Sequence, residues 1–385
     1  MSALTAVDHA SVLIQGEKIH TVSTNSIHAP DALKIDAKNR VVMPAFVDAH
    51  THLCWAGDRL DEWELKQRGA SYLELLEAGG GIMSTVRAVR EATVDQLTEQ
   101  LLTRLNAMLY EGTTACEIKS GYGLSTHDEL KMLEAITAAS RVWPGKILPT
   151  ACIGHAKDPD VPHFVDQTIH ETLPAINEQY PGIPIDAYTE SGAWNLEETI
   201  QLFTAAKKLG HPLRIHADQF NELGMVEAGI ELGVLSVDHL EATSKNSLKQ
   251  LARSHSMGVM LPCSGFHVDG RYGDGRGFID AGGALVIATN TNPGSAPCVS
   301  MPMSIALATR HVGITAAEAI TASTVNAAHL LGTKQLGTIK EDSQADLIML
   351  KHTDERQLGY EFGGSQVDLV ICNGKIVLQK EIHHI

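Results

Sequence analysis

Short hydrophobic runs alternate with longer amphipathic stretches along most of the chain. Eight of these runs follow position 40, and we predict that each forms a strand. They are residues 45–48, 113–118, 146–153, 184–188, 213–215, 236–237, 258–261 and 285–288. Strands that alternate with helices in this way favour a parallel sheet built from βα units.

The stretches between the runs have the pattern of helices. Leucines recur every four residues at positions 97, 101, 105 and 109, which places them on one face of a helix. Three pairs have the spacing of an N-cap residue and its capping-box partner. They are Thr93 with Gln96, Asn195 with Glu198, and Thr315 with Glu318.

Eight βα units of this size predict an α/β fold, a (β/α)8 TIM barrel. A doubly wound open sheet is the alternative, but no GxGxxG turn follows a strand. Both ends of the chain instead carry short alternating runs and turn signals, including the hairpin-forming pair Asn373-Gly374. We therefore expect a small β-sandwich domain from residues 1–43 and 336–385, and a catalytic barrel from residues 44–335.

Composition narrows the class of protein. The 385 residues are 44% hydrophobic and 20% charged, which suits a globular core, and the formal net charge of −16 argues against a nucleic-acid partner. We see no apolar run of transmembrane length and no signal peptide, so we expect a cytoplasmic protein with no membrane partner. The scattered cysteines form no CxxC pair, and we interpret them as buried, reduced thiols. They are Cys54, Cys116, Cys152, Cys263, Cys298 and Cys372.

Polar residues follow the predicted strands, and five of them are histidines. Active sites of TIM barrels lie at this end of the strands. The residues in question are His50 and His52 after the first strand, Lys119 and Tyr122 after the second, His155 after the third, Glu190 after the fourth, His216 and His239 at the ends of the fifth and sixth, and Asn290 after the eighth.

The triplet His50-Thr51-His52 is a candidate metal site. Alternate residues of a strand point the same way, so both imidazoles can reach one ion. His216 ends an apolar run and is the candidate third ligand. Three ligands and an open position are typical of a catalytic metal site. Two unrelated polar residues in a turn and an ordinary core histidine are the alternative interpretations.

Two further features lie on later strands. His239 can act as an acid or base, or polarise a carbonyl, or it can be a structural residue behind the site. The loop after the eighth strand supplies Asn290, Asn292, Gly294 and Ser295 at the barrel mouth, although an ordinary βα loop would contain similar residues.

Taken together, these residues identify a resemblance. The chain resembles the imidazolonepropionases of the amidohydrolase superfamily over residues 43–335. The His-x-His triplet is common to the superfamily, whereas the Lys-Ser-Gly-Tyr-Gly and Gly-Gly-Gly-Ile stretches are more specific. The stretches that carry the resemblance are residues 43–52, 56–59, 69–72, 78–87, 117–124, 216–219, 238–241 and 292–295.

The resemblance implies hydrolysis of the cyclic amide 4-imidazolone-5-propanoate to N-formimidoyl-L-glutamate, in histidine degradation. It implies one zinc or iron ion on His50, His52 and His216, with catalysis by His239, Gln219 and Asn290. Substrate contacts would come from Arg59, Tyr122, His155, Gln219, Asn292, Gly294 and Ser295. A propionate tail calls for a fixed cation, and Arg59 offers a bidentate guanidinium; its alternative is a surface ion pair with Asp58 or Asp61. Related enzymes are usually dimers, so a homodimer is expected by analogy.

The chain departs from the family at Asn290, where an aspartate would bind the metal and take a proton from water. An amide oxygen can still approach a metal, but it cannot act as a base, and loss of a base typically costs about 10²- to 10⁴-fold in rate. Three explanations are open: an engineered substitution that traps substrate, a base role for His239 alone, or a lost or changed activity.

The strand-seven loop, residues 261–267, also differs from the family, and the stretch at 270–277 is rich in Gly and Arg. We place this stretch at the pocket, although a flexible surface loop is the simpler reading. Three hypotheses follow: an active imidazolonepropionase, an amidohydrolase with a different ring substrate, or a non-catalytic ligand-binding homologue.

Overall fold

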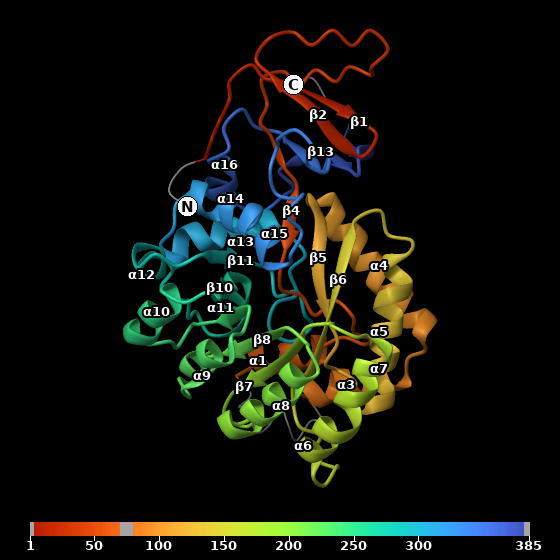
Figure 1. Ribbon diagram of the computed structural model, residues 1–385, viewed down its shortest axis with the longest axis vertical. Coiled ribbons are helices and arrows are strands. Elements are labelled where there is room, and N and C mark those ends of the chain that lie inside the picture. The colour runs from red at the N-terminus through yellow and green to blue at the C-terminus, as the bar shows by residue number, and fades with distance from the viewer. Residues whose placement is uncertain (1–3, 70–79, 381–385) are drawn as a thin grey trace.

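A computed structural model describes residues 4–69 and 80–380, and its centre is a barrel of eight parallel strands (Figure 1). The strand order follows the chain from β4 to β11, and all eight predicted strands are confirmed with ends shifted by at most a few residues. The strands are β4 (Phe46–Asp48), β5 (Thr113–Lys119), β6 (Lys146–Gly154), β7 (Ile185–Thr189), β8 (Leu213–Ala217), β9 (Ser236–His239), β10 (Met257–Met260) and β11 (Leu285–Ile287).

Backbone hydrogen bonds just beyond β4 and β11 bring the two edge strands together. The amide of Asn290 donates to the carbonyl of His50 at 3.0 Å, and the amide of His52 donates to the carbonyl of Thr291 at 2.9 Å. The ring of strands is therefore joined at the end where the candidate site residues lie.

Helices surround the barrel, and the three predicted capping boxes are confirmed at α4, α8 and α14. The leucine face of α4 is buried, as its four-residue repeat predicts. The helices are α1 (Leu60–Gln67), α3 (Ile82–Glu91), α4 (Val94–Tyr110), α5 (Thr126–Ser140), α6 (Phe164–Gln167), η1 (Thr168–Thr172), α7 (Leu173–Gln179), α8 (Leu196–Lys208), α9 (Met225–Leu232), α10 (Lys245–Ala252), α11 (Pro262–Val268), α12 (Gly275–Asp280), α13 (Met301–Leu307), η2 (Ala308–Val312), α14 (Ala316–Ala322), α15 (Val325–Leu330) and α16 (Gln357–Tyr360).

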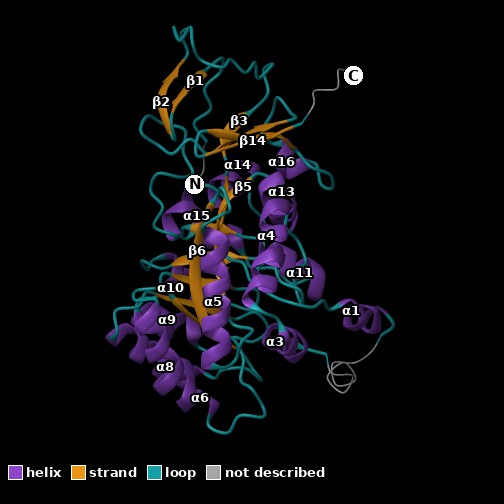
Figure 2. Cartoon of the chain, turned by 90° about the vertical axis from the view of Figure 1, so that its right-hand side faces the viewer, coloured by secondary structure: helices purple, strands orange, loops and turns teal. Residues whose placement is uncertain are grey.

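The two ends of the chain meet in a small antiparallel β unit at one end of the molecule (Figure 2). An apolar layer packs the hairpin of β1 and β2 against a four-stranded sheet, and contains Ile19, Leu347 and Leu369. The sheet has the order β14-β13-β12-β3, and the predicted Asn373-Gly374 hairpin joins β13 to β14. These strands are β1 (Ser11–Gln15), β2 (Lys18–Ser23), β3 (Val42–Pro44), β12 (Leu347–Leu350), β13 (Val367–Cys372) and β14 (Lys375–Gln379).

Two other expectations concern the chain as a whole. Within residues 4–69 and 80–380, no helix has the length and apolarity needed to cross a bilayer. All six cysteines are free, and five of them are buried, with Cys298 partly exposed. The domain boundaries at 43 and 336 stay predictions, and positions 70–72, 78 and 79 of the family motifs lie outside the described residues.

Candidate active site

The five histidines predicted at strand ends lie together at one end of the barrel. The ring of His50 is 4.5 Å from that of His216 and 6.0 Å from that of His239, measured between centroids. His52 lies 5.1 Å from His216 and stacks on His155 at 4.6 Å. The structure therefore gathers residues that are far apart in the sequence into one cluster.

Three of these imidazoles have Nδ1 next to a carboxylate. The distances are 2.6 Å from His50 to Asp238, 3.0 Å from His216 to Asp186 and 3.2 Å from His239 to Glu241. A carboxylate at Nδ1 holds the proton there and leaves Nε2 as a lone-pair donor, which is the usual arrangement behind a metal ligand. Burial, and next Lys119, holds the pKa of His50 well below its usual value, so that imidazole is neutral.

These histidines satisfy the requirements of a metal site. The ligand atoms of His50, His216 and His239 all lie within 4.8 Å of one another. Nε2 of His50 and Nδ1 of His52 are buried and have no hydrogen-bond partner. Nε2 of His52 lies 3.0 Å from Nε2 of His216, close to the separation of about 3.3 Å expected for two nitrogen ligands of a tetrahedral zinc ion.

His52 and His239 compete for the third ligand position beside His50 and His216. His52 lies 5.3 and 5.1 Å from those two rings, whereas His239 lies 6.0 and 5.6 Å from them. By ring centroid His52 is therefore the nearer third imidazole, whereas the three ligand atoms that lie within 4.8 Å of one another belong to His50, His216 and His239.

A second group, Cys152, Asp186 and His216, also has ligand atoms within 4.8 Å of one another. Its carboxylate already forms an ion pair with the Lys119 ammonium at 2.5 Å, and burial raises the pKa of the Cys152 thiol well above its usual value. A cation next to that ammonium would be repelled, so this group is the poorer metal site.

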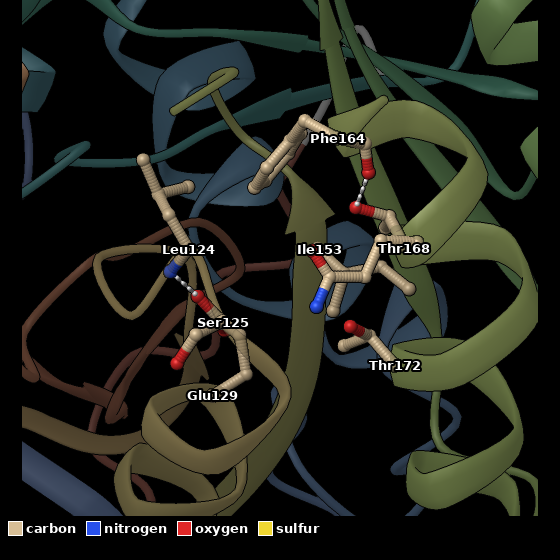
Figure 3. A pocket seen from close by; sticks show the side chains of 8 residues that line it. Leu124, Ser125, Glu129, Ile153, Phe164, Thr168 and Thr172 are labelled. Atoms are coloured by element: carbon tan, nitrogen blue, oxygen red, sulfur yellow. Dashed lines mark hydrogen bonds between the residues drawn. The ribbon is translucent and has the colours of Figure 1, made fainter. Parts of the chain in front are cut away.

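Tyr122 and His155 lie on the side of the cluster nearest His52. Their ring centroids are 5.1 Å apart, and burial lowers the pKa of His155 to about 3, which keeps this imidazole neutral. The loop after β5 that carries Tyr122 is held by Glu129, which accepts hydrogen bonds from the amides of Gly123 and Leu124. Figure 3 shows the bond from Leu124.

The pocket drawn in Figure 3 lies behind this loop, between α5 and the α6–η1 segment. None of the predicted site residues lines it, and Phe164 and Leu124 make part of its wall apolar. We assign no ligand to this pocket.

Gln219 follows β8 and faces Tyr188, whose hydroxyl donates to Oε1 of Gln219 at 2.8 Å. Glu190, at the end of the neighbouring strand, accepts hydrogen bonds from the amides of Phe220 and Asn221. Glu190 therefore fixes the loop that carries Gln219, and its carboxylate is occupied by that loop.

Arg59 lies beside the loop after β11. Its Nε and Nη2 atoms donate to the two carboxylate oxygens of Glu62 at 2.6 Å, so its ion-pair partner is Glu62 rather than Asp58 or Asp61. Its Nη1 lies 3.3 Å from the position that a Cβ on Gly294 would take. Asn292 accepts hydrogen bonds from the amides of Gly294 and Ser295 at 2.8 and 2.7 Å, which forms a tight turn next to the guanidinium.

Asn290 is buried and close to the histidines, since its amide donates to the carbonyl of His50. Its φ of 57° is in the left-handed region, which residues other than glycine seldom adopt. Other residues at the ends of barrel strands or in the loops that follow them share this left-handed conformation, a feature that is concentrated at functional sites. They are Leu124, Asp218, His239 and Leu240.

The Gly- and Arg-rich stretch after strand seven is more ordered than a flexible loop. It contains the start of α12, and Arg276 forms an ion pair with Glu318. The preceding segment forms α11, in which Ser264 lies 3.4 Å from Nε2 of Gln219. The strand-seven segment therefore borders the candidate site through α11.

Sequence reasoning missed the layer beneath the histidines. Two of the missed residues, Glu117 and Arg214, stand two positions before a predicted residue on the same strand, so they point into the barrel from the same face. Glu117 precedes Lys119 in this way, and Arg214 precedes His216, whereas Asp186 and Asp238 have no predicted residue at that spacing. The period-two rule was the signal, but an apolar core was the simpler expectation for the barrel interior.

Comparison with known proteins agrees with this geometry. The profile of the amidohydrolase family matches residues 41–377. An imidazolonepropionase from Herpetosiphon aurantiacus is 42% identical over 100% of this chain and 93% of its own length. One from Chloroflexus aggregans is 38% identical over 90% of this chain and 85% of its own.

Solved structures support the fold at low sequence identity. A 5-methylcytosine deaminase from Klebsiella pneumoniae has a TM-score of 0.78 at 16% identity, covering 99% of this chain and 97% of its own. An atrazine chlorohydrolase from Arthrobacter aurescens, complexed with zinc, has a TM-score of 0.75 at 17% identity, covering 98% of this chain and 92% of its own. With its barrel, its histidine cluster and these sequence matches, the chain belongs to the amidohydrolase family and, within it, to the imidazolonepropionases.

Proposed function

We propose that this protein is a metal-dependent hydrolase that opens the ring of 4-imidazolone-5-propanoate to give N-formimidoyl-L-glutamate. The observation that carries the proposal is the buried cluster of imidazoles, three of which have a carboxylate at Nδ1. The close relatives are imidazolonepropionases along nearly their whole length.

His50, His52 and His216 would hold one zinc or iron ion, and Asn290, whose backbone amide contacts the carbonyl of His50, would offer an amide oxygen. When bound, the ion acts as a Lewis acid that polarises the ring carbonyl and lowers the pKa of water. The protein's own contribution is a set of imidazole nitrogen donors that are already oriented.

His239 is the candidate acid and base of the reaction. Its Nδ1 is held by Glu241, so Nε2 can take a proton from water and pass it to the ring nitrogen that leaves. The strained backbone at His239, with φ of 91°, fixes the ring beside His216. Gln219, oriented by Tyr188, would hold the ring through its amide, with Tyr122 and His155 on the opposite side.

Arg59 would bind the carboxylate tail through its Nη1 edge, beside Asn292, Gly294 and Ser295. Glu62 already occupies the other edge of the guanidinium, which orients it towards the loop. A charged side chain that is only 11% exposed gains more from a carboxylate partner than one in free solvent.

The free thiols and the family's metabolic substrate favour action in the cytoplasm, and family analogy favours a homodimer.

Asn290 favours a second candidate, a homologue that binds the substrate without hydrolysing it. The test is turnover of 4-imidazolone-5-propanoate by the natural chain and by Asn290→Asp, on samples of equal metal content. If His239 is a sufficient base, the natural chain turns over substrate and Asn290→Asp changes kcat by less than about 10-fold. Substrate binding without turnover, with hydrolysis restored in Asn290→Asp, would establish the second candidate instead.

A panel of other cyclic amides and amidines separates the remaining alternative. The proposal expects the highest kcat/KM for the ring that carries a propionate tail. A higher kcat/KM for a ring that lacks a carboxylate would assign the chain to a different substrate class.

A further inference from the structure

Beneath the histidine cluster, a continuous chain of charged side chains connects His50 with His216. Every link is a direct contact, and the charges alternate in sign along the chain. From His50 the contacts run to Asp238 at 2.6 Å, Arg214 at 2.7 Å, Glu117 at 2.6 Å, Lys119 at 2.9 Å, Asp186 at 2.5 Å and His216 at 3.0 Å.

These five charged residues are almost completely buried, with side-chain exposures of 0 to 2%. Buried charges are costly to desolvate, and replacing buried ion pairs by apolar side chains is often neutral or stabilising, so these charges are weak evidence for a stabilising role. Burial and Arg214 lower the pKa of Lys119, but Asp186, Glu117 and Asp238 raise it by more, so the ammonium stays charged. Three carboxylates and two cations leave a formal net charge of −1 below the site, which favours a cation above it.

We propose that the five residues Glu117, Lys119, Asp186, Arg214 and Asp238 act as one unit that orients both imidazoles and sets the affinity of the site for its metal ion. The inference rests on the proposed metal site and extends it to residues that touch no ligand. Glu117 is the critical case. It contacts neither imidazole, yet it joins Arg214 on the His50 side of the charged unit to Lys119 on the His216 side.

Removing the charge of Glu117 has two physical consequences. The net charge of the unit rises to zero, so a cation is attracted less strongly. Lys119 and Arg214, which both contact Oε1 of Glu117, then repel each other without a carboxylate between them. Each cation is also bonded to an aspartate that holds an imidazole, so their displacement moves His50 and His216.

The experiment measures zinc affinity of the full-length protein by competition with a chromogenic chelator, without any activity assay. We compare the natural chain with Glu117→Gln, which preserves shape, and with Thr150→Val, which removes only a hydrogen bond to Glu117. Thr113→Val is the matched control, because Thr113 is fully buried on β5, the strand of Glu117, and its hydroxyl has no hydrogen-bond partner.

The proposal predicts that Glu117→Gln weakens zinc binding by about 10- to 100-fold, in the range seen when a residue behind a metal ligand is changed. Thr150→Val should weaken it less, and Thr113→Val should leave it unchanged. Thermal unfolding of the metal-free proteins checks that each variant is folded. If Glu117→Gln is not folded, the zinc affinity of Thr150→Val tests the proposal instead.

Two outcomes separate this inference from the proposed function. If the natural chain binds no zinc or iron, the proposed metal site and this inference are both wrong. If it binds zinc and the folded Glu117 and Thr150 variants bind it equally well, the inference alone is overturned. A double variant of Glu117→Gln and Asp238→Asn should lose less affinity than the two single losses combined, because both changes break the same unit.

Discussion

The guanidinium of Arg59 is placed by its neighbours before any substrate arrives. Glu62 accepts two hydrogen bonds from one edge, and the absence of a side chain at Gly294 leaves room beside Nη1. A preoriented guanidinium loses little conformational entropy when it binds a carboxylate. Arg59 is therefore the one residue to which we assign recognition of the carboxylate tail.

Replacing Arg59 with methionine tests this assignment. A hydrogen bond to a charged group contributes about 1.5–3 kcal/mol, so KM should rise by about 10- to 150-fold while kcat changes little. Arg68→Met is the matched control, because Arg68 ends the same helix and its side chain is 70% exposed. An unchanged KM in Arg59→Met, or an equal effect in Arg68→Met, would remove Arg59 from the binding site.

Most of the strands and helices can be predicted from local sequence patterns. The strands and the capping boxes could be predicted because apolar runs and cap residues act over a few positions. The contacts within the buried layer of Glu117, Lys119, Asp186, Arg214 and Asp238 could not, because its partners come from four different strands; only Lys119 was expected at a strand end. Likewise, the partner of Arg59 depended on where α1 begins, which spacing alone does not determine.

The capping box of α8 gives a prediction at this scale. Oδ1 of Asn195 accepts a hydrogen bond from the amide of Glu198 at 2.9 Å. Asn195→Ala should lower the free energy of unfolding by about 0.5–2 kcal/mol, measured by urea denaturation, with kcat/KM unchanged. Asn195→Asp keeps a good cap and should retain the stability; equal losses in both variants would contradict the capping explanation.

At the scale of the whole molecule, the two ends of the chain depend on each other. The amide of Ala345 donates to the carbonyl of Glu17 at 2.8 Å, and the amide of Gly374 donates to the carbonyl of Ala345 at 3.0 Å. A Cβ on Gly374 would lie 1.9 Å from the carbonyl oxygen of Gly16. The turn between β13 and β14 therefore packs directly on the turn between β1 and β2.

Gly374→Ala should separate the two turns. Gly364→Ala is the control, because Gly364 has a similar φ of 75° but nothing lies within 4 Å of its Cβ position. Both variants carry the left-handed backbone cost of about 1–2 kcal/mol, and Gly374→Ala should lose additional stability. Limited proteolysis should also cut the N-terminal hairpin faster in Gly374→Ala; equal stability and equal cutting of the two variants would show that the turns do not support each other.

The central claim, which rests on the barrel, the histidine cluster and the family, is that three imidazoles hold a single ion on which hydrolysis depends. The most direct test measures metal content and turnover of 4-imidazolone-5-propanoate on the same samples of the natural chain and of His216→Ala. We predict about one zinc or iron ion per chain, turnover that is lost on chelation and restored with the metal, and neither metal nor turnover in His216→Ala. Full turnover by the metal-free protein, or equal metal content in His216→Ala, would contradict the claim.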